Sequence, residues 1–309
     1  MKSTRIYLVI LISLLSLLPF LASAQEFIPI WGEEMPNSRG LEITDSIANE
    51  RVYQVGTPGV YVFETSEAEN KNAAVLIIPG GGYVRLAYQI SGFQLAKWFN
   101  TFGVTAFVLN HRFPQSPDVI DSYKAPLQDA QRAMKFIRAN AKTWNIDPER
   151  VGAMGSSAGG HLAACLSTFT EDWSNVGEEL DKQAFLPNFT LLISPVIDMN
   201  EYAHQGSRDN LLGKEASQEL KDLFSCHLRV TEDTPPALLI HATNDKSVSS
   251  MNSILYYSAL KQNRVANASL LIFPEGGHSI SLRDNPGITN SWPTLAEDWL
   301  RPWTKSEQE

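Results

Sequence analysis

Short apolar runs alternate with helical patterns through most of the chain, and this alternation limits its fold more than any other feature. The apolar runs are residues 73–78, 104–109, 151–154, 189–193, 237–242 and 268–273. The helical patterns are residues 91–102, 122–144, 158–168, 249–262 and 293–303. Strands that are apolar on both faces are typical of a sheet covered by helices on both sides. The sequence therefore predicts an α/β fold with a mostly parallel central sheet.

Two segments depart from this alternation. Residues 51–64 alternate apolar and polar side chains around Gly56-Thr57-Pro58-Gly59, which predicts two antiparallel strands joined by a turn. Residues 198–233 are polar and irregular, with only short helical patches. An insertion of this size over the open end of the sheet would act as a lid or a substrate wall. The alternative is a surface excursion that does not touch the substrate.

The first 24 residues have the pattern of an export signal. Lys2 and Arg5 give a positive start, and residues 6–21 are almost wholly apolar. Ala22-Ser23-Ala24 is a small-x-small cleavage site. A membrane anchor is the alternative, because the apolar run approaches the roughly 18–20 residues that a span needs. The cleavage triplet favours a signal peptide over residues 1–24.

The mature chain is then expected to begin at Gln25, with residues 25–309 forming one domain that works in the periplasm or the medium. The full chain has a formal net charge of −9, and loss of two cations with the signal makes the mature chain still more acidic. An acidic protein without a basic cluster is a poor candidate for binding nucleic acid or an anionic membrane. We therefore expect no nucleic-acid partner and no stable membrane anchor after cleavage.

The motif Gly155-Ser156-Ser157-Ala158-Gly159 is the strongest chemical signal in the sequence. It matches G-x-S-x-G and lies between a predicted strand and a predicted helix, where a sharp turn presents the central hydroxyl. Small residues at both ends let the strand and the helix approach closely. The spacing to the two glycines selects Ser157, rather than Ser156, as the nucleophile. The alternative is a glycine-rich turn that only caps a helix.

A serine hydroxyl needs a base that takes its proton and an acid that holds the base in one tautomer. In folds of this kind the acid and the histidine follow the serine in that order, each on a loop after a strand. His278 follows the last predicted strand behind two glycines, and we expect it to be the base. Asp245 follows the strand at residues 237–242, and we expect it to be the acid.

Four other residues are alternatives for these roles. Asp198 begins the irregular insertion, where a helix or turn cap is the more typical role, and Glu275 lies three residues before the expected base. His241 lies inside an apolar strand run, and His161 lies one helical turn past the serine. Both histidines are therefore expected to be structural.

Amide donors for the oxyanion of an acyl-transfer reaction are expected from two places. Gly80-Gly81-Gly82-Tyr83 follows the strand at residues 73–78, and consecutive glycines let backbone N–H groups turn inward. We expect Gly81 and Gly82 to donate from this loop, and Ala158 to donate from the residue after the nucleophile. The alternatives are a flexible loop or a phosphate cradle, but no lysine follows the glycines.

The chain has two cysteines, Cys165 and Cys226, so it is not a disulfide scaffold. A single bridge between them is possible. However, Cys165 lies in an apolar stretch, which is more typical of a buried free thiol.

The sequence resembles the secreted bacterial α/β-hydrolase esterases related to acetylxylan and feruloyl esterases. The resemblance runs from about Phe63 onward and depends on four motifs in this order: Pro79-Gly80-Gly81-Gly82-Tyr83, Gly155-Ser156-Ser157-Ala158-Gly159-Gly160-His161, Asp245 and His278. Proline before the three glycines is similar to the carbohydrate-esterase branch. The resemblance implies an α/β-hydrolase fold with a short lid-like insertion, an acylated carbohydrate or small ester as substrate, and no metal or organic cofactor.

The activity expected from this resemblance is serine-dependent hydrolysis of acetyl or related acyl esters on plant polysaccharides such as xylan. A small-ester carboxylesterase and a serine peptidase are alternatives on the same scaffold. A non-catalytic protein that binds carbohydrate is an alternative of another class, since seven tryptophans could stack on sugars. However, Trp292, Trp299 and Trp303 have near-helical spacing in the last helix, which favours packing on the sheet.

Overall fold

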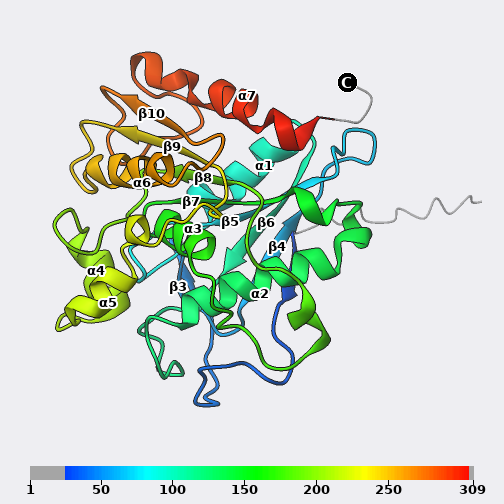
Figure 1. Ribbon diagram of the computed structural model, residues 1–309. Coiled ribbons are helices and arrows are strands. Elements are labelled where there is room, and N and C mark those ends of the chain that lie inside the picture. Colours follow the sequence, from blue (N-terminus) through cyan, green and yellow to red (C-terminus); the bar gives the residue numbers. More distant parts are fainter. Residues whose placement is uncertain (1–24, 306–309) are drawn as a thin grey trace, which may run out of the picture.

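The computed structural model describes residues 25–305, and an eight-stranded sheet lies at its centre (Figure 1). The strand order is β1-β4-β6-β5-β7-β8-β9-β10. The strands are β1 (Glu26–Pro29), β4 (Gly59–Phe63), β5 (Ala73–Ile78), β6 (Val104–Asn110), β7 (Val151–Ser156), β8 (Thr190–Ile193), β9 (Ala237–Ala242) and β10 (Ser269–Phe273). The six strands from β6 to β10 in this order pair in parallel, whereas β4 runs antiparallel to both of its neighbours, β1 and β6. The predicted mostly parallel sheet is confirmed.

Helices cover both faces of the sheet. One face packs against α1 (Gln94–Asn100) and α7 (Trp292–Thr304), and the other against α2 (Ala125–Ala139), α3 (Ala158–Thr168) and α6 (Met251–Gln262). In Figure 1, α7 runs along the top of the molecule and α2 lies below the sheet. Strand β5 is buried on both faces because alternate side chains enter the two cores.

The tryptophans of α7 pack against the core, as their spacing predicts, although Trp299 and Trp303 remain partly exposed. Trp292 is fully buried, and its ring lies 5.3 Å from that of Trp98 on α1. Trp303 lies 4.8 Å from the ring of Phe189 at the start of β8. These rings therefore fasten the last helix to the sheet.

The predicted hairpin over residues 51–64 is wrong. β3 (Arg51–Gln54) pairs with β2 (Ser46–Ala48) in a separate two-stranded sheet, whereas β4 lies between β1 and β6 in the main sheet. Both edges of β4 are therefore occupied, so β3 has no edge to pair with. The turn between them is instead held by the preceding loop, because Gly56 N donates to Asp45 Oδ1 at 2.6 Å.

Two predicted helices are shorter than their patterns suggest. The pattern at residues 122–144 becomes α2 followed by a separate 3-10 turn (Ala141–Trp144), with Asn140 between them. The side chain of Asn140 donates to Phe136 O at 2.8 Å, which is a local cap that ends the helix. The pattern at residues 91–102 becomes a π-helical turn (Gln89–Phe93) that leads into α1.

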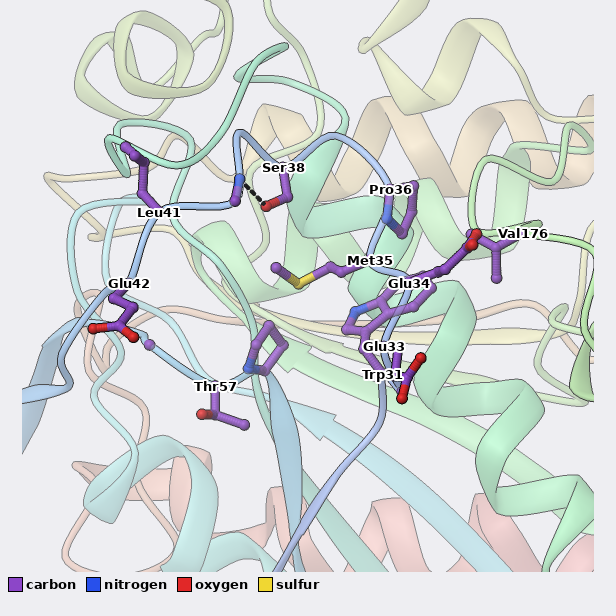
Figure 2. Close-up of a pocket in the computed structure, with 14 residues that line it drawn as sticks. Trp31, Glu33, Glu34, Met35, Pro36, Ser38, Leu41, Glu42, Thr57 and Val176 are labelled. Carbon is purple, nitrogen blue, oxygen red and sulfur yellow. Dashed lines mark hydrogen bonds between the residues drawn. The ribbon is translucent and has the colours of Figure 1, made fainter.

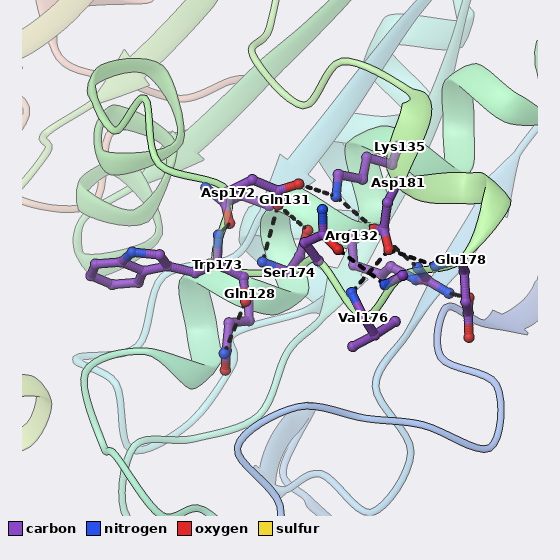
Figure 3. A network of polar contacts seen from close by, with 12 residues as sticks. Gln128, Gln131, Arg132, Lys135, Asp172, Trp173, Ser174, Val176, Glu178 and Asp181 are labelled. Atoms are coloured by element: carbon purple, nitrogen blue, oxygen red, sulfur yellow. Dashed lines mark hydrogen bonds and ion pairs between the residues drawn. The ribbon is translucent and has the colours of Figure 1, made fainter.

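Buried cations on α2 hold the loop after α3 in place (Figure 3). Lys135 Nζ contacts Asp172 Oδ2 at 2.6 Å and Asp181 Oδ1 at 2.8 Å, and its side chain is fully buried. Arg132 pairs with Glu178 in the same loop and donates to Ile30 O at 2.9 Å. Because these charges are paired with one another, we assign this network a structural role.

Candidate active site

Ser157 occupies a sharp turn between β7 and α3, with φ 55° and ψ −124°. A positive φ is strained for a serine, and such strain is typical of a nucleophile presented at the end of a strand. No residue with a side chain fits at the neighbouring Gly155 and Gly159. A Cβ on Gly159 would lie 2.1 Å from Ile78 O, and a Cβ on Gly155 would lie 2.2 Å from Gly159 O. The turn therefore has the geometry that the G-x-S-x-G motif predicts.

A chain of two hydrogen bonds joins the three predicted catalytic side chains. His278 Nε2 lies 2.9 Å from Ser157 Oγ, and His278 Nδ1 lies 2.8 Å from Asp245 Oδ2. The carboxylate accepts from Nδ1–H, which leaves Nε2 as the acceptor for the serine proton. The structure thus brings together three residues from loops that are far apart in the sequence.

The Asp245 carboxylate is fully buried and receives several hydrogen bonds. Its Oδ1 accepts from the backbone N–H of Ser247 at 2.8 Å and of Val248 at 2.9 Å. Burial alone would raise the pKa of Asp245, but hydrogen bonds from His241, His278 and the Val248 amide outweigh it and hold this pKa well below its ordinary value. Asp245 is therefore ionised in the folded protein at neutral pH.

Neither alternative acid contacts His278. Asp198 caps a turn, because its carboxylate accepts from the backbone N–H of Asn200 at 3.1 Å and of Tyr202 at 2.7 Å. Glu275 has an exposed side chain and contributes only its carbonyl, which accepts from Thr289 Oγ1 at 2.5 Å.

Both alternative histidines are buried and hydrogen-bonded away from the serine. His241 Nδ1 lies 2.8 Å from Ser253 Oγ, and its Nε2 lies 3.3 Å from Asp245 Oδ2. His161 bonds Tyr83 and Phe224, as described below. The sequence suggested structural roles for both, but it gave no sign that His241 supports the acid.

The glycine loop lies directly against the nucleophile turn. A Cβ on Gly80 would lie 2.8 Å from Ser156 O and 3.2 Å from Ser157 Cβ. Gly81 and Gly82 have φ values of 147° and 67°, which only glycine adopts without strain. Within the described residues, the backbone N–H groups of Gly81 and Gly82 donate to no protein acceptor. These two N–H groups therefore remain available to a developing oxyanion.

The insertion at residues 198–233 contacts this site. It contains α4 (Gln205–Leu212), α5 (Gln218–Leu223) and a 3-10 turn (Cys226–Leu228), with α4 and α5 at the left of Figure 1. Asn210 Nδ2 donates to Gly82 O at 2.8 Å. His204 lies close enough to His278 for their charges to interact: burial lowers the pKa of His204, and His278 lowers it further. No motif in the sequence pointed to Asn210 or His204.

In the described part of the structure, one hollow lies away from the three predicted catalytic side chains and another is lined by one of them. The larger, of about 650 Å³, lies between residues 31–42 and residues 56–58, and no predicted site residue lines it (Figure 2). The smaller, of about 350 Å³, lies beside Asp245 between residues 201–203 and residues 245–250. The larger hollow is therefore not the candidate active site.

Cys165 and Cys226 meet in the core beside His161. Their Sγ atoms are 3.5 Å apart without a disulfide, so the predicted free thiol at Cys165 is confirmed. Cys165 Sγ lies 3.6 and 3.7 Å from the two ring nitrogens of His161, and is therefore over the face of the ring. Because both nitrogens already bond Tyr83 and Phe224, this group does not fit a metal ion.

Neither thiol should react while the protein is folded. Both thiols are closed off from solvent, since 1% of Cys165 and none of Cys226 is exposed. Burial raises the pKa of Cys165 well above its ordinary value, whereas the hydrogen bond with Cys165 and the nearby His161 outweigh burial and lower the pKa of Cys226. Lack of access therefore keeps both thiols from reacting. Ellman's reagent should find no thiol in the native protein and two per chain after denaturation without a reductant. If the denatured protein shows none, the two cysteines form a disulfide and this account of them is wrong.

Comparisons with known proteins identify the family to which this fold belongs. The BD-FAE family model matches residues 60–260. An acetylxylan esterase from Xylanibacter ruminicola is 38% identical over 244 residues, which cover 74% of this chain and 47% of that protein. The chain spans about half the length of the curated relatives that it matches, or slightly less.

Solved structures show the same architecture. The acetyl ester-xyloside bifunctional hydrolase from Caldicellulosiruptor lactoaceticus is 32% identical with a TM-score of 0.76, covering 92% of this chain and 98% of that chain. The α/β-hydrolase MGS-M1 from a deep-sea metagenome is 21% identical with a TM-score of 0.59, covering 85% of this chain and 97% of that chain. The predicted α/β-hydrolase fold is confirmed.

Proposed function

Because this chain belongs to the BD-FAE family, we propose that it is a serine-dependent carboxylic ester hydrolase that removes acetyl or related acyl groups from a plant polysaccharide such as xylan. The observation that supports this most is the hydrogen-bonded chain from Ser157 through His278 to Asp245, beside amides that have no protein acceptor. This arrangement has the parts that acyl transfer requires: a nucleophile, an oriented base and donors for the oxyanion.

The proposed reaction has two acyl-transfer steps. Ser157 Oγ attacks the ester carbonyl while His278 Nε2 takes its proton, and Asp245 stabilises the imidazolium that forms. The oxyanion accepts hydrogen bonds from the amides of Gly81, Gly82 and Ala158, which are the proposed oxyanion hole. His278 then gives its proton to the departing alcohol. Water repeats the sequence on the acyl-serine and releases the acid.

The proposed substrate rests on the relatives. The curated relative at 38% identity is named an acetylxylan esterase, and the solved neighbour at 32% identity is named an acetyl ester-xyloside bifunctional hydrolase. Both names include hydrolysis of an acetyl ester, and both refer to xylan or to a xyloside.

Export is part of the proposal. The expected signal peptide at residues 1–24 lies outside the described residues. Among the described helices, none is long and apolar enough to cross a bilayer. We propose that a mature protein beginning at Gln25 meets its polymeric substrate in the periplasm or the medium, because a polysaccharide of this kind does not enter the cytoplasm.

Three substrates test this function on the mature protein. We expect release of acetate from acetylated xylan and from a small aryl acetate, and no comparable hydrolysis of a dipeptide amide. Cleavage of the aryl acetate alone would keep the chemistry and reject the polysaccharide. Hydrolysis of the amide as fast as the ester would favour a peptidase, and no hydrolysis of any of the three would favour a binding protein.

A further inference from the structure

We infer that Asn210, on the insertion, is a positioning residue that holds the oxyanion loop in its productive shape; this role rests on the proposed function. Asn210 lies on α4, far in sequence from the glycine loop, yet its side-chain amide donates to Gly82 O at 2.8 Å. It is half-buried and touches none of the three proposed catalytic side chains through a hydrogen bond. It would therefore act on the reaction only through the loop.

The hydrogen bonds that the carbonyls of Gly80, Gly81 and Gly82 accept show why the contact from Asn210 matters. Gly80 O accepts from Ala87 N at 2.8 Å, and Gly81 O accepts from Val84 N at 3.3 Å. Both bonds are local to the loop. Each carbonyl fixes the plane of its own peptide, and with it the direction of the next residue's N–H. These two bonds therefore orient the N–H groups of Gly81 and Gly82, the two donors proposed for the oxyanion.

The third carbonyl, that of Gly82, is held from outside the loop. Gly82 sits between two peptide planes at φ 67°, and a Cβ added there would meet nothing within 4 Å, so no atom packs against it on that side. Glycine is also the residue with the widest choice of backbone conformations. The bond from Asn210 thus fixes the plane of the peptide between Gly82 and Tyr83 from outside the loop.

A second link from the insertion ends at the next residue of the loop. Tyr83 Oη donates to His161 Nδ1 at 2.7 Å, and His161 Nε2–H donates to Phe224 O at 2.8 Å. His161 lies on α3, the helix that begins with Ala158, and Phe224 belongs to the insertion. Two links therefore connect the insertion to the glycine loop: the hydrogen bond from Asn210 to Gly82, and the bonds from Phe224 through His161 to Tyr83. We call these two links the brace. They hold the loop in a fixed position relative to the nucleophile turn.

Kinetics on a small aryl acetate test this role. Loss of the hydrogen bond from Asn210 should let the glycine loop sample other shapes, so Asn210→Ala should lower kcat about tenfold with KM changed less than twofold. An aryl trifluoromethyl ketone is a second probe: Ser157 adds to its carbonyl, the serine proton passes to His278, and the oxyanion occupies the hole. Its inhibition constant should rise by the same factor as kcat/KM falls.

Matched variants separate this role from a general loss of structure. Gln115→Ala removes a neighbouring hydrogen bond, from Gln115 Nε2 to Asn210 O at 2.8 Å, and leaves the glycine loop intact. Its kcat and its inhibition constant should stay within twofold of the wild-type values. Asn210→Asp keeps the size but loses the donor, and should be at least as impaired as Asn210→Ala. Wild-type kinetics in Asn210→Ala or Asn210→Asp would overturn the inference.

Amide hydrogen exchange gives a readout that does not need activity. Asn210→Ala should speed exchange in a peptide covering residues 80–88, whereas Gln115→Ala should not. Unchanged exchange in Asn210→Ala would show that Asn210 does not hold the loop. A wild type that hydrolyses no ester would refute the proposed function itself, and the exchange comparison would still decide whether the brace exists.

Discussion

Replacing Ser157 with alanine should lower kcat on a small aryl acetate by roughly 10⁵- to 10⁶-fold. Ser157 Oγ is the atom hydrogen-bonded to His278 Nε2, and no other hydroxyl within residues 25–305 bonds that nitrogen. Without it, neither acyl transfer to the protein nor the second, hydrolytic step can occur by the proposed route. The amides and the substrate contacts would remain, so binding should change little.

The neighbouring serine provides the matched control for this variant. Ser156 precedes the nucleophile in the same turn but has no hydrogen bond to His278. Ser156→Ala should therefore keep activity within a few-fold of wild type. If Ser156→Ala abolished hydrolysis and Ser157→Ala did not, the assignment of the nucleophile would be wrong. Thermal unfolding of both variants checks that each one folds.

Replacing Asp245 with asparagine should lower kcat by about 10⁴-fold in a protein that still folds. An amide in this position can present its N–H to His278 Nδ1, which would stabilise the wrong tautomer and leave Nε2 unable to take the serine proton. The imidazolium would also lose its ionised partner. The kinetic measurement is kcat on the aryl acetate at neutral pH.

Asp198→Asn is the control for the acid. Asp198 caps a turn with its carboxylate and does not contact His278, so the substitution should affect stability more than kcat. Near-normal activity in Asp245→Asn would contradict the assignment, and the acid role would pass to Asp198 or Glu275.

The depressed pKa of Asp245 also gives the sign of a pH effect on stability. An unperturbed aspartate has a pKa of about 3.9, and the pKa of Asp245 in the folded protein is lower. The ionised carboxylate therefore contributes its full stabilisation above about pH 3.9. This contribution is lost as the pH falls through the pKa of the folded state. Asp245→Asn removes the contribution. The difference in unfolding free energy between wild type and variant should therefore shrink as the pH falls below about 4.

The sequence was sufficient to predict those helices and strands whose structure depends on burial of both faces or on the spacing of nearby residues. Strands β5 and β9 and helix α3 have the bounds that their apolar patterns predict. The triad side chains follow strand ends, which all parallel strands present at the same edge of the sheet, so their proximity follows from the fold.

Sequence patterns failed where pairing depends on distant segments. The strands at residues 51–64 look like a hairpin, but the partners of β4 are β1 and β6, and no local pattern encodes that choice. The contacts of Asn210 with Gly82 and of His241 with Asp245 are equally non-local, because each joins loops that only the folded chain brings together.

The most direct test of the central claim is to identify the residue that becomes covalently modified. The mature protein is treated with a phosphorylating ester such as paraoxon, digested, and examined by peptide mass spectrometry. We predict one diethylphosphoryl group on Ser157, with loss of esterase activity in proportion to labelling and no labelling of Ser157→Ala. A label on another residue, or complete inactivation with Ser157 unmodified, would contradict the account.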